Sequence, residues 1–367
     1  TTRRSTRCCM PRNSLHKHTV ATMSRYRNIL IPRFSAMGDV AMLAAVVRLA
    51  AQQNPDVRFN VVTRKGFELF FTFGSSLDNL AAHGVDLKEE RYKGIGGMRR
   101  LTSECIKKWH PDAMADMHLS LRTRLMSLFM MLRGKRVRHL DKQRASRRAL
   151  TARHGKKLVP LRPMTECYAD VLRSLGIEVT LSERVLVGPF ASPFFESNAR
   201  TGHKAVGVAP FARHEGKIYP VELMERVVEG LSAAGTDVFV FGGGAREREV
   251  AERWSAAYDG VVSVIGHLDM AGEMALMSNL DAMISMDSAS QHIASLVSVP
   301  VVSVWGATHP AAGFYGYGQE TAGAVELDME CRPCSVFGNK PCYKGGYPCM
   351  HGIEPETITR RVTEVIA

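Results

Sequence analysis

The sequence predicts two α/β domains, each built on a parallel sheet with helices on both faces, and a cleft between them. The 367 residues, 45% of them hydrophobic and 23% charged, suit two globular domains of ordinary size. Strand-like apolar segments alternate with helix-like segments in both halves, and parallel strands need such crossover connections. Because the sequence holds no run of roughly 20 apolar residues, we expect no membrane-spanning helix.

The first half begins with a clear strand and helix. Residues 27–34 form a predicted buried strand, and an apolar-periodic helix follows from residue 40 to about 52. The alternation continues with a strand, a short helix or turn, a strand that ends near Met117, and two further helices (57–64, 66–74, 110–118, 119–134 and 165–175). We assign residues 23–187 to the first domain.

The alternation restarts after a segment containing Pro, Ser and Asn, residues 188–204, which we take as the linker. The second domain, residues 205–367, has a predicted strand at each of 205–212, 237–244, 261–266, 281–286 and 300–307. The predicted helices between them are 220–235, 245–258, 270–280 and 287–298. Ligands bind such sheets at the carboxyl ends of their strands, so two facing domains predict a cleft.

The formal charge of +12 is concentrated in two segments. Residues 1–22 are basic and lack both acids and an apolar core, so we expect a disordered leader, with Met23 as the alternative initiator and a transit peptide as a further alternative. Residues 133–157 hold eleven basic residues and Asp141. They form either a solvated charged face or an anion-binding edge for phosphorylated lipid heads or a membrane surface. Nucleic acid fits the charge, but the block has no interleaved aromatics for base stacking.

Two carboxylates follow predicted strands at helix starts. Gly38 and Asp39 come after the first strand, where Asp39 is either a helix cap or a general base on the cleft. Asp287 precedes Ser288, Ala289 and Ser290 at the start of another helix, whose amides favour an anion. There too, simple capping is the alternative.

Two further positions border the predicted cleft. Gly242 and Gly243 follow a strand of the second domain and permit close backbone approach, although the full dinucleotide fingerprint is missing. Lys217 lies after that domain's first strand, where it is either a phosphate-neutralising cation or an ordinary exposed lysine.

In order and spacing, these segments resemble glycosyltransferase family 9, the heptosyltransferase-type enzymes. The opening ILIPRFSAMGDV is similar to the family's strand followed by S-x-x-G-D. The segments GVAPFARHEGKIYP, VFVFGGG and MDSASQHIASLVSVPVVSVWGATHP are similar to its P-x-A…K-x-[WY]-P, GG and D-S-x-x-x-H-x-A series. The likeness covers nearly all of the second half. In the first half it is limited to the opening unit, DMHLSLRTR and ECYADVLRSLGI.

The resemblance implies a GT-B architecture and a cytoplasmic, membrane-peripheral enzyme of lipopolysaccharide synthesis. It implies inverting, metal-independent transfer of a heptose or related sugar from a nucleotide diphosphate, ADP-heptose first among them, to a glycolipid acceptor. Asp39 would act as base, with Lys217 on the leaving diphosphate. The implied donor site contains Gly242, Gly243, Glu247, Leu268, Asp287, Ser288, Ala289 and Ser290, and the implied acceptor site Gly38 and Arg122. His292 would be structural.

Departures from the family pattern leave the donor open. Arg213 and His214 occupy the loop where the family often has Thr or Ser, Ala289 replaces a common Gly, and Ala307 replaces a Pro. A nucleotide-sugar epimerase or hydrolase of the same fold remains an alternative, as does a nucleic-acid-binding protein that uses residues 133–157.

Four of the eight cysteines cluster near the end of the sequence. Cys331, Cys334, Cys342 and Cys349 have short, knuckle-like spacing, which is compatible with a structural zinc site. Two local disulfides or free thiols are the alternatives. We expect no cofactor in catalysis, since the cluster lies beyond the strands that form the cleft.

Overall fold

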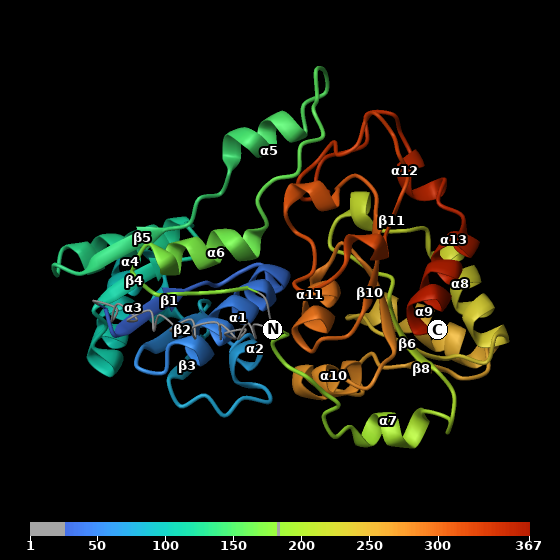
Figure 1. The fold of residues 1–367 in the computed structure, drawn as a ribbon, viewed down its shortest axis with the longest axis horizontal. Coiled ribbons are helices and arrows are strands. Elements are labelled where there is room, and N and C mark those ends of the chain that lie inside the picture. Colours follow the sequence, from blue (N-terminus) through green and yellow to red (C-terminus); the bar gives the residue numbers. More distant parts are fainter. Residues whose placement is uncertain (1–25, 182–183) are drawn as a thin grey trace, which may run out of the picture.

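The computed structural model describes residues 26–181 and 184–367. The predicted leader, residues 1–22, lies outside the described residues. Two parallel sheets, one from each half, stand side by side with helices packed around them (Figure 1). No helix in these residues is long and apolar enough to span a bilayer.

The first sheet has five strands in the order β3-β2-β1-β4-β5, all parallel. The short strands β3 and β5 and the helix α3 were not predicted from the sequence. Of these, β5 has four residues, RVRH, three of them basic, so no apolar run marked it. The strands are β1 (Asn28–Pro32), β2 (Arg58–Arg64), β3 (Leu80–Val85), β4 (Ala113–Asp116) and β5 (Arg136–His139).

The second sheet has six parallel strands in the order β11-β10-β9-β6-β7-β8. The strand order of each sheet reverses direction at a switch point, which lies between β1 and β4 in the first and between β6 and β9 in the second. These are Rossmann-like orders, and the predicted fold class is confirmed. The strands are β6 (Ala205–Ala209), β7 (Asp237–Val240), β8 (Val261–Ser263), β9 (Ala282–Met286), β10 (Val301–Trp305) and β11 (Ala324–Glu326).

Helices cover both faces of each sheet. Those of the first half are α1 (Met37–Gln53), α2 (Leu69–Thr72), α3 (Gly94–Trp109), α4 (Leu121–Met131), α5 (Arg144–Leu150) and α6 (Met164–Arg173). Those of the second half are α7 (Pro193–Asn198), α8 (Val221–Ala233), α9 (Ala245–Ala257), α10 (Met270–Met277), α11 (Ala289–Leu296), α12 (Pro348–His351) and α13 (Pro355–Ile366).

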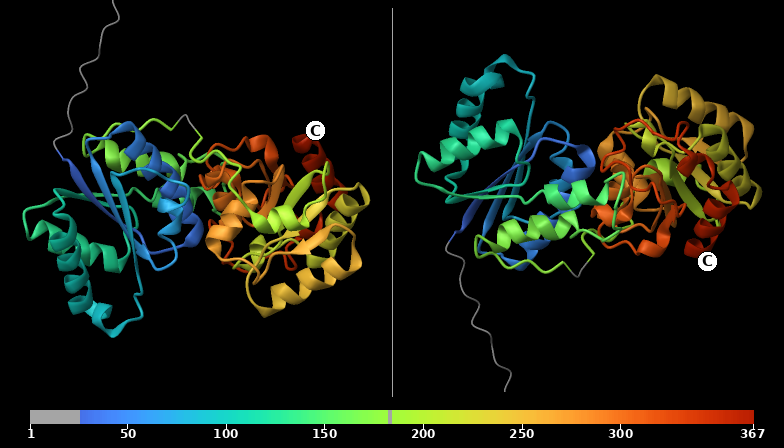
Figure 2. Two further views of the ribbon diagram at one scale, coloured as in Figure 1. Left: turned by 90° about the horizontal axis from the view of Figure 1, so that it is seen from below. Right: turned by 90° about the horizontal axis from the view of Figure 1, so that it is seen from above.

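Strand alternation sorts these helices into layers. Successive residues of β1 point to opposite faces, so that Leu30 packs with α3 and α4, while Ile29 and Ile31 pack with α1 and α6. Figure 2 shows the two helix layers on either side of the first sheet, with α1 on the side of the second half. The apolar cluster around α1 runs on into α11, so one core crosses between the halves.

Helix α1 is buried on every side. All residues from Val40 to Ala51 are buried, including Arg48, because the helix is enclosed by the first sheet, α6 and α11. Its sequence, VAMLAAVVRLAA, is apolar all round rather than amphipathic, which is typical of a helix inside a core. The Arg48 guanidinium donates to the carbonyl oxygens of Phe70 and Phe73, and burial lowers its pKa to about 10.

The segment predicted as a linker, residues 188–204, contains α7 and packs on the second half. The Phe190 amide donates to Ser278 Oγ at 2.9 Å, and the Asn279 side chain donates to the Phe190 carbonyl at 2.8 Å. Arg200 forms an ion pair with Asp237 at 2.5 Å. This segment is therefore fixed to the domain that follows it.

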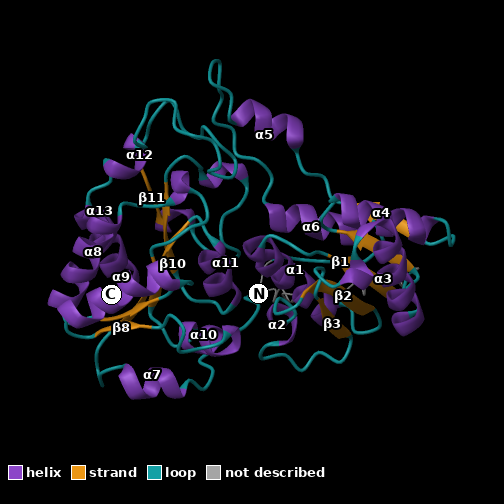
Figure 3. Ribbon diagram, turned by 180° about the vertical axis from the view of Figure 1, so that it is seen from behind, coloured by secondary structure: helices purple, strands orange, loops and turns teal. Residues whose placement is uncertain are grey.

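The later part of the basic block, together with the residues that follow it, forms an arm, residues 141–163, that reaches from the first half to loops of the second (Figure 3). The earlier part of the block contains β5 of the first sheet. The Leu161 amide donates to the Ala311 carbonyl at 2.8 Å, and Leu150 packs on Ala311 and Ala312. Arg153 stacks over the ring of Tyr343 at 4.6 Å. Part of the block's charge is thus used to hold the arm against the second domain.

Lys156 attaches the far end of the arm. Its ammonium group donates to the carbonyl oxygens of Cys331, Pro333 and Glu330 at 2.7, 3.0 and 3.3 Å. We expect Lys156→Met to raise the rate of limited proteolysis within the arm about tenfold, because a methionine side chain cannot donate these three hydrogen bonds. Lys157→Met, at the exposed neighbouring position, is the control, and equal cleavage of the two variants would contradict the assigned contact.

Candidate active site

The candidate site lies where the switch points of the two sheets face each other across α1 and α11. Asp39 follows β1, Lys217 follows β6 and Asp287 follows β9. Because β6 and β9 are neighbours, their carboxyl ends bring Lys217 and Asp287 together. The contact of α1 with α11 then places Asp39 beside them.

Asp39 lies in the first turn of α1 and is not the capping residue itself. Ala36 occupies the cap position, and its amide donates to Asp39 Oδ2 at 3.3 Å. Arg33 Nη2 lies 2.9 Å from the same oxygen, and the Tyr168 hydroxyl lies 3.5 Å from Oδ1. The Asp39 side chain keeps 22% of its surface exposed, so the carboxylate is held in place and still accessible.

The surroundings of Asp39 favour its ionised form. Burial acts to raise the pKa of the carboxyl, but the Arg33 guanidinium and the Ala36 amide act against burial, and the pKa is lowered overall. Arg33 is itself held by the Met117 carbonyl and by the ring of Tyr168, 5.2 Å away. Asp39 is therefore a carboxylate at neutral pH.

Lys217 and Asp287 form a second ion pair, with Nζ 2.7 Å from Oδ2. Their side chains are 15% and 5% exposed. Gln291 Nε2 donates to Asp287 Oδ1 at 3.2 Å, which fixes the carboxylate at the start of α11. Ser288 is the cap residue of α11 but makes no side-chain cap bond, and Ala289 and Ser290 form the first turn. The helix start thus presents amides next to a buried cation.

His292 lies between the two ion pairs. Burial lowers its pKa to about 4, against the opposing effects of Asp287 and Asp39, so the ring is neutral at pH 7. A Cβ added at Gly38 would lie 2.7 Å from His292 Cδ2 and 3.3 Å from Ala289 Cα. Gly38 therefore permits the close approach of α1 and α11 that assembles the site.

The predicted glycine turn lies after β7. Glu247, in the first turn of α9, accepts a hydrogen bond from the Gly243 amide at 2.6 Å. A Cβ at Gly242 would lie 2.8 Å from Glu247 Oε2, so the carboxylate closes directly over the turn. Leu268 follows β8 and is half-buried in the loop before α10. Gly242, Gly243 and Glu247 are thus brought together, as a nucleoside-binding wall would require.

Arg122 is not joined to these groups. It lies at the start of α4 and is exposed. The motif that singled it out, DMHLSLRTR, instead brings His118 to the site, with Nε2 3.3 Å from Ser35 Oγ. Burial, Arg33 and Lys142 lower the pKa of His118 to about 4.

Arg147, from α5, and the half-buried Lys142 are cations of the basic block that interact electrostatically with Asp39. Arg147 is the more closely enclosed by side chains of the second half. Its guanidinium stacks over the rings of Phe314 and Phe337, at 4.7 and 6.0 Å, and interacts electrostatically with Asp39. Its Nε is buried and has no hydrogen-bond partner among the described residues. In the sequence, Arg147 is one of many cations in a charged block, and no pattern there indicates that its side chain turns inward.

The predicted zinc site is not assembled in this structure. Within residues 26–181 and 184–367, no three His, Cys, Asp or Glu side chains are placed to hold a metal ion. Cys334 is held by the Ala307 carbonyl, Cys349 is buried in α12, and burial raises the pKa of both thiols. The four cysteines are thus free thiols in this structure, which is one of the alternatives that the sequence left open.

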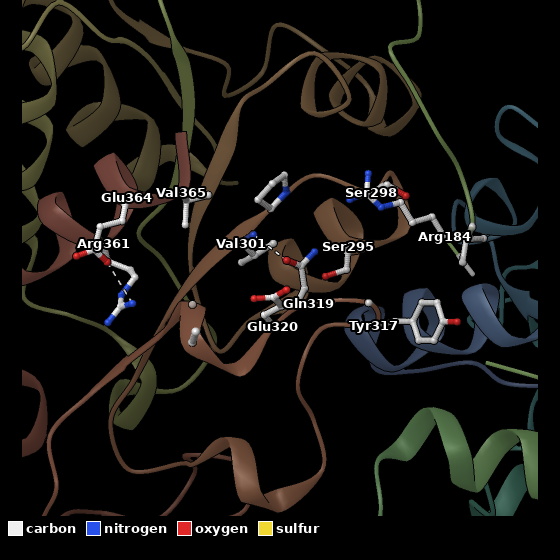
Figure 4. A pocket seen from close by; sticks show the side chains of 15 residues that line it. Arg184, Ser295, Ser298, Val301, Tyr317, Gln319, Glu320, Arg361, Glu364 and Val365 are labelled. Atoms are coloured by element: carbon white, nitrogen blue, oxygen red, sulfur yellow. Dashed lines mark hydrogen bonds and ion pairs between the residues drawn. The ribbon is translucent and has the colours of Figure 1, made fainter. Parts of the chain in front are cut away.

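A cavity of about 410 Å³ lies elsewhere, at the opposite end of β10 (Figure 4). Ser298, Gln319 and Arg361 line it, and none of the predicted site residues does. Gln319 bonds the backbone at Val301 and Val299, and Arg361 is paired with Glu364 at 3.2 Å. The candidate site is a helix interface flanked by ion pairs and is separate from this cavity.

Two facing Rossmann-like domains are the architecture of the GT-B fold. The family model described as "Glycosyltransferase family 9 (heptosyltransferase)" matches residues 112–342, more than half of the chain. The chain belongs to this family, as the motifs predicted.

Curated relatives match over part of their length. The chain is 32% identical over 129 residues to lipopolysaccharide heptosyltransferase 1 of Pseudomonas aeruginosa, covering 35% of this chain and 34% of the relative. It is 24% identical over 172 residues to lipooligosaccharide heptosyltransferase 2 of Campylobacter jejuni, covering 46% and 52%. The chain thus spans about a third to a half of the length of these relatives.

Solved structures match over nearly the whole chain. A family 9 glycosyltransferase from Veillonella parvula has a TM-score of 0.70 at 17% identity, covering 93% of this chain and 97% of that one. The Escherichia coli heptosyltransferase WaaC with ADP has a TM-score of 0.64 at 18% identity, covering 92% and 99%. At these identities the likeness establishes the fold.

The close approach at Gly38 makes a stability prediction. Ala in place of Gly inside a helix normally stabilises, but here the added Cβ meets His292, so we expect Gly38→Ala to lower the free energy of unfolding by about 1–3 kcal/mol. Gly96→Ala in α3 is the matched control, because nothing lies within 4 Å of its added Cβ. Thermal unfolding measures both, and a Gly38→Ala variant as stable as the control would refute the described contact.

Proposed function

We propose that the chain is an inverting, metal-independent glycosyltransferase that moves a heptose from ADP-heptose to a lipopolysaccharide-core or related glycolipid acceptor. One observation carries the proposal: an ionised Asp39 faces the buried Lys217–Asp287 pair across the α1–α11 contact. The names of the relatives support the substrate class, since they are lipopolysaccharide and lipooligosaccharide heptosyltransferases. Solved structures of WaaC with ADP and with ADP-2-deoxy-2-fluoro heptose support the donor.

Asp39 is the proposed general base. Its carboxylate takes the proton of the acceptor hydroxyl while that oxygen attacks the anomeric carbon of the donor sugar. The attack comes from the face opposite the diphosphate, so one C–O bond forms, the bond to the diphosphate breaks, and the configuration inverts. Arg33 and the Ala36 amide hold Asp39 ionised and oriented before the acceptor arrives.

Lys217 and the start of α11 are the proposed stabilisers of the leaving group. Charge develops on the diphosphate as its bond to the sugar breaks, and a buried ammonium beside helix amides lowers the energy of that charge. Lys217 is paired with Asp287 in the free protein, so the diphosphate must share the cation with this carboxylate. Asp287 then also lies where it can accept hydrogen bonds from sugar hydroxyls. These groups supply the positive charge that a metal ion would otherwise provide.

The nucleoside is proposed to bind against Gly242, Gly243, Glu247 and Leu268. The two glycines bring the backbone close to a ligand, and Glu247 offers carboxylate oxygens to ribose hydroxyls. This wall lies after β7 and β8, which continue the row of strand ends that begins at β9 and β6. A nucleotide laid along the row would place its diphosphate at Lys217.

The acceptor is proposed to be anionic and to bind on the side of the first domain. Arg147 lies near Asp39 with its Nε unpaired among the described groups, so a phosphate or carboxylate next to the attacking hydroxyl would complete its bonding. Gly38 and the exposed Arg122 remain proposed acceptor contacts. We further propose a cytoplasmic enzyme in peripheral contact with the inner membrane, where such an acceptor is found.

The base assignment is tested by Asp39→Asn. The amide cannot accept the proton, so we expect transfer from ADP-heptose to fall by about 10²–10⁴. The affinity for ADP, measured by thermal shift, should change by less than about twofold, since Asp39 does not touch the nucleotide. Asp78→Asn, an exposed aspartate of the same domain, is the control. Normal turnover by Asp39→Asn would overturn the mechanism, and failure of every nucleotide diphosphate to bind would overturn the function.

The role of Arg33 is tested by the pH profile. Arg33 lowers the pKa of Asp39, so its loss should raise that pKa and move the acid limb of kcat/KM to higher pH by about one unit. Arg33→Met should therefore be most impaired at low pH and partly recover above the shifted limb. Arg33→Lys keeps a cation and should shift the limb less. A loss of activity that is equal at every pH would argue that Arg33 acts only on folding.

A further inference from the structure

Helix α4 has an outer face that nothing in the described structure covers. The helix packs on the first sheet through Thr123, Met126, Ser127 and Met130, which are buried. Together with α3 it forms the end layer of the molecule, on the far side of the first sheet from the second domain (Figures 1 and 2). Its opposite face is therefore turned away from the protein.

That outer face is apolar. Leu121, Leu128 and Leu132 are 77%, 45% and 73% exposed, and Met131 is 49% exposed. Leu125, which is half-buried, lies between them. The four leucines stand at positions i, i+4, i+7 and i+11, so they form one stripe along the helix. Burying these side chains elsewhere would remove apolar surface from water, so the stripe marks a contact surface.

The stripe is surrounded by positive charge. Arg122 and Arg124 lie on the helix itself, and Arg133, Lys135 and Arg136 follow it. Residues 117–140 contain no Asp or Glu. The neighbouring α3 adds Arg99, Arg100, Lys107 and Lys108 against the single acid Glu104, and Arg133 joins the two helices by donating to Ser103 Oγ at 3.1 Å. A partner of this surface must therefore be both apolar and negatively charged.

We infer that α4 docks on an anionic lipid bilayer, with its leucine stripe inserted at the headgroup level and its cations on the lipid phosphates. A helix with leucines on one side and arginines beside them, lying in the plane of the interface, is the expected chemistry of such contact. A second copy of the chain fits less well, because a symmetric contact would bring two strongly basic layers together. This inference deepens the proposed membrane contact and assigns it to α4, whereas Arg147, Arg153 and Lys156 of the arm are engaged with the second domain.

The test is co-sedimentation of the full chain with phosphatidylcholine vesicles that contain or lack phosphatidylglycerol. We expect binding only to the anionic vesicles, and weaker binding as salt is raised. The variant Leu121→Ser/Leu128→Ser/Leu132→Ser should bind about tenfold more weakly, because it removes the inserted side chains. Arg124→Gln/Lys135→Gln/Arg136→Gln should also weaken binding. All substituted side chains apart from the half-buried Lys135 are exposed, and circular dichroism melts check that each variant folds.

A matched control uses the arm. Leu158 and Val159 are also exposed, at 51% and 59%, so Leu158→Ser/Val159→Ser removes apolar surface at a different basic site. The inference would be overturned if this variant lost vesicle binding while the leucine-stripe variant still bound as the wild-type chain does. The inference would also be overturned if the wild-type chain did not bind vesicles and light scattering showed it to be a dimer, while the leucine-stripe variant was a monomer. That result would assign the face to a second copy of the chain.

The vesicle experiment contains no sugar donor, so its result is independent of the proposed reaction. Transfer to a water-soluble acceptor should be the same for the wild-type chain and the leucine-stripe variant. If the chain binds vesicles through α4 but transfers no heptose, the proposed function fails and the docking surface stands.

Discussion

The contact between α1 and α11 is the constraint on which the rest of the structure depends. Each helix starts at a switch point of its own sheet, so bringing the helices together also brings the two switch points together. The approach is close because Gly38 has no side chain to hold His292 and Ala289 away. One apolar core then forms through both domains, and the charged residues at the helix starts are carried to its edge.

The close approach of the two helices removes charged groups from water, which is unfavourable, and ion pairs in the site offset this desolvation. Asp39 lies near an apolar interface, where burial alone would raise the pKa of its carboxyl, and the Asp287 side chain is also buried. Each is matched with a cation from the loop after a strand, Arg33 after β1 and Lys217 after β6. His292 between them stays neutral, so the two pairs remain separate.

The sequence predicted the parts of the fold that have long, regular patterns. The buried strands around β1, β6 and β9 and the helices after them were expected in place, because apolar runs and turn residues define them locally. Strands β3 and β5 were missed, because LAAHGV and RVRH are short and carry little apolar pattern. Their position comes from pairing with β2 and β4, which is a tertiary effect.

Some residues of the candidate site could also be predicted from the sequence, and others could not. Asp39, Lys217 and Asp287 could be found because they sit at strand ends within recognisable motifs. The partners Arg33, Tyr168 and Arg147 could not, since each depends on how an element packs in three dimensions. Arg147 is the clearest case, because its neighbours in the sequence, Arg144 and Arg148, are exposed while it turns inward. A block of like charges does not reveal which member is desolvated.

The arm, residues 141–163, adds a second attachment between the two domains. The chain crosses from the first half to the second at the segment that carries α7, and the arm makes a separate noncovalent attachment through Lys156, Arg153 and Leu161. The two halves also share one apolar core across α1 and α11. Because the arm lies apart from this core, the halves can separate only if the packing of the core and the contacts of the arm are both lost. Opening the interface therefore requires the arm to detach as well, which adds to the free energy needed to part the two sheets.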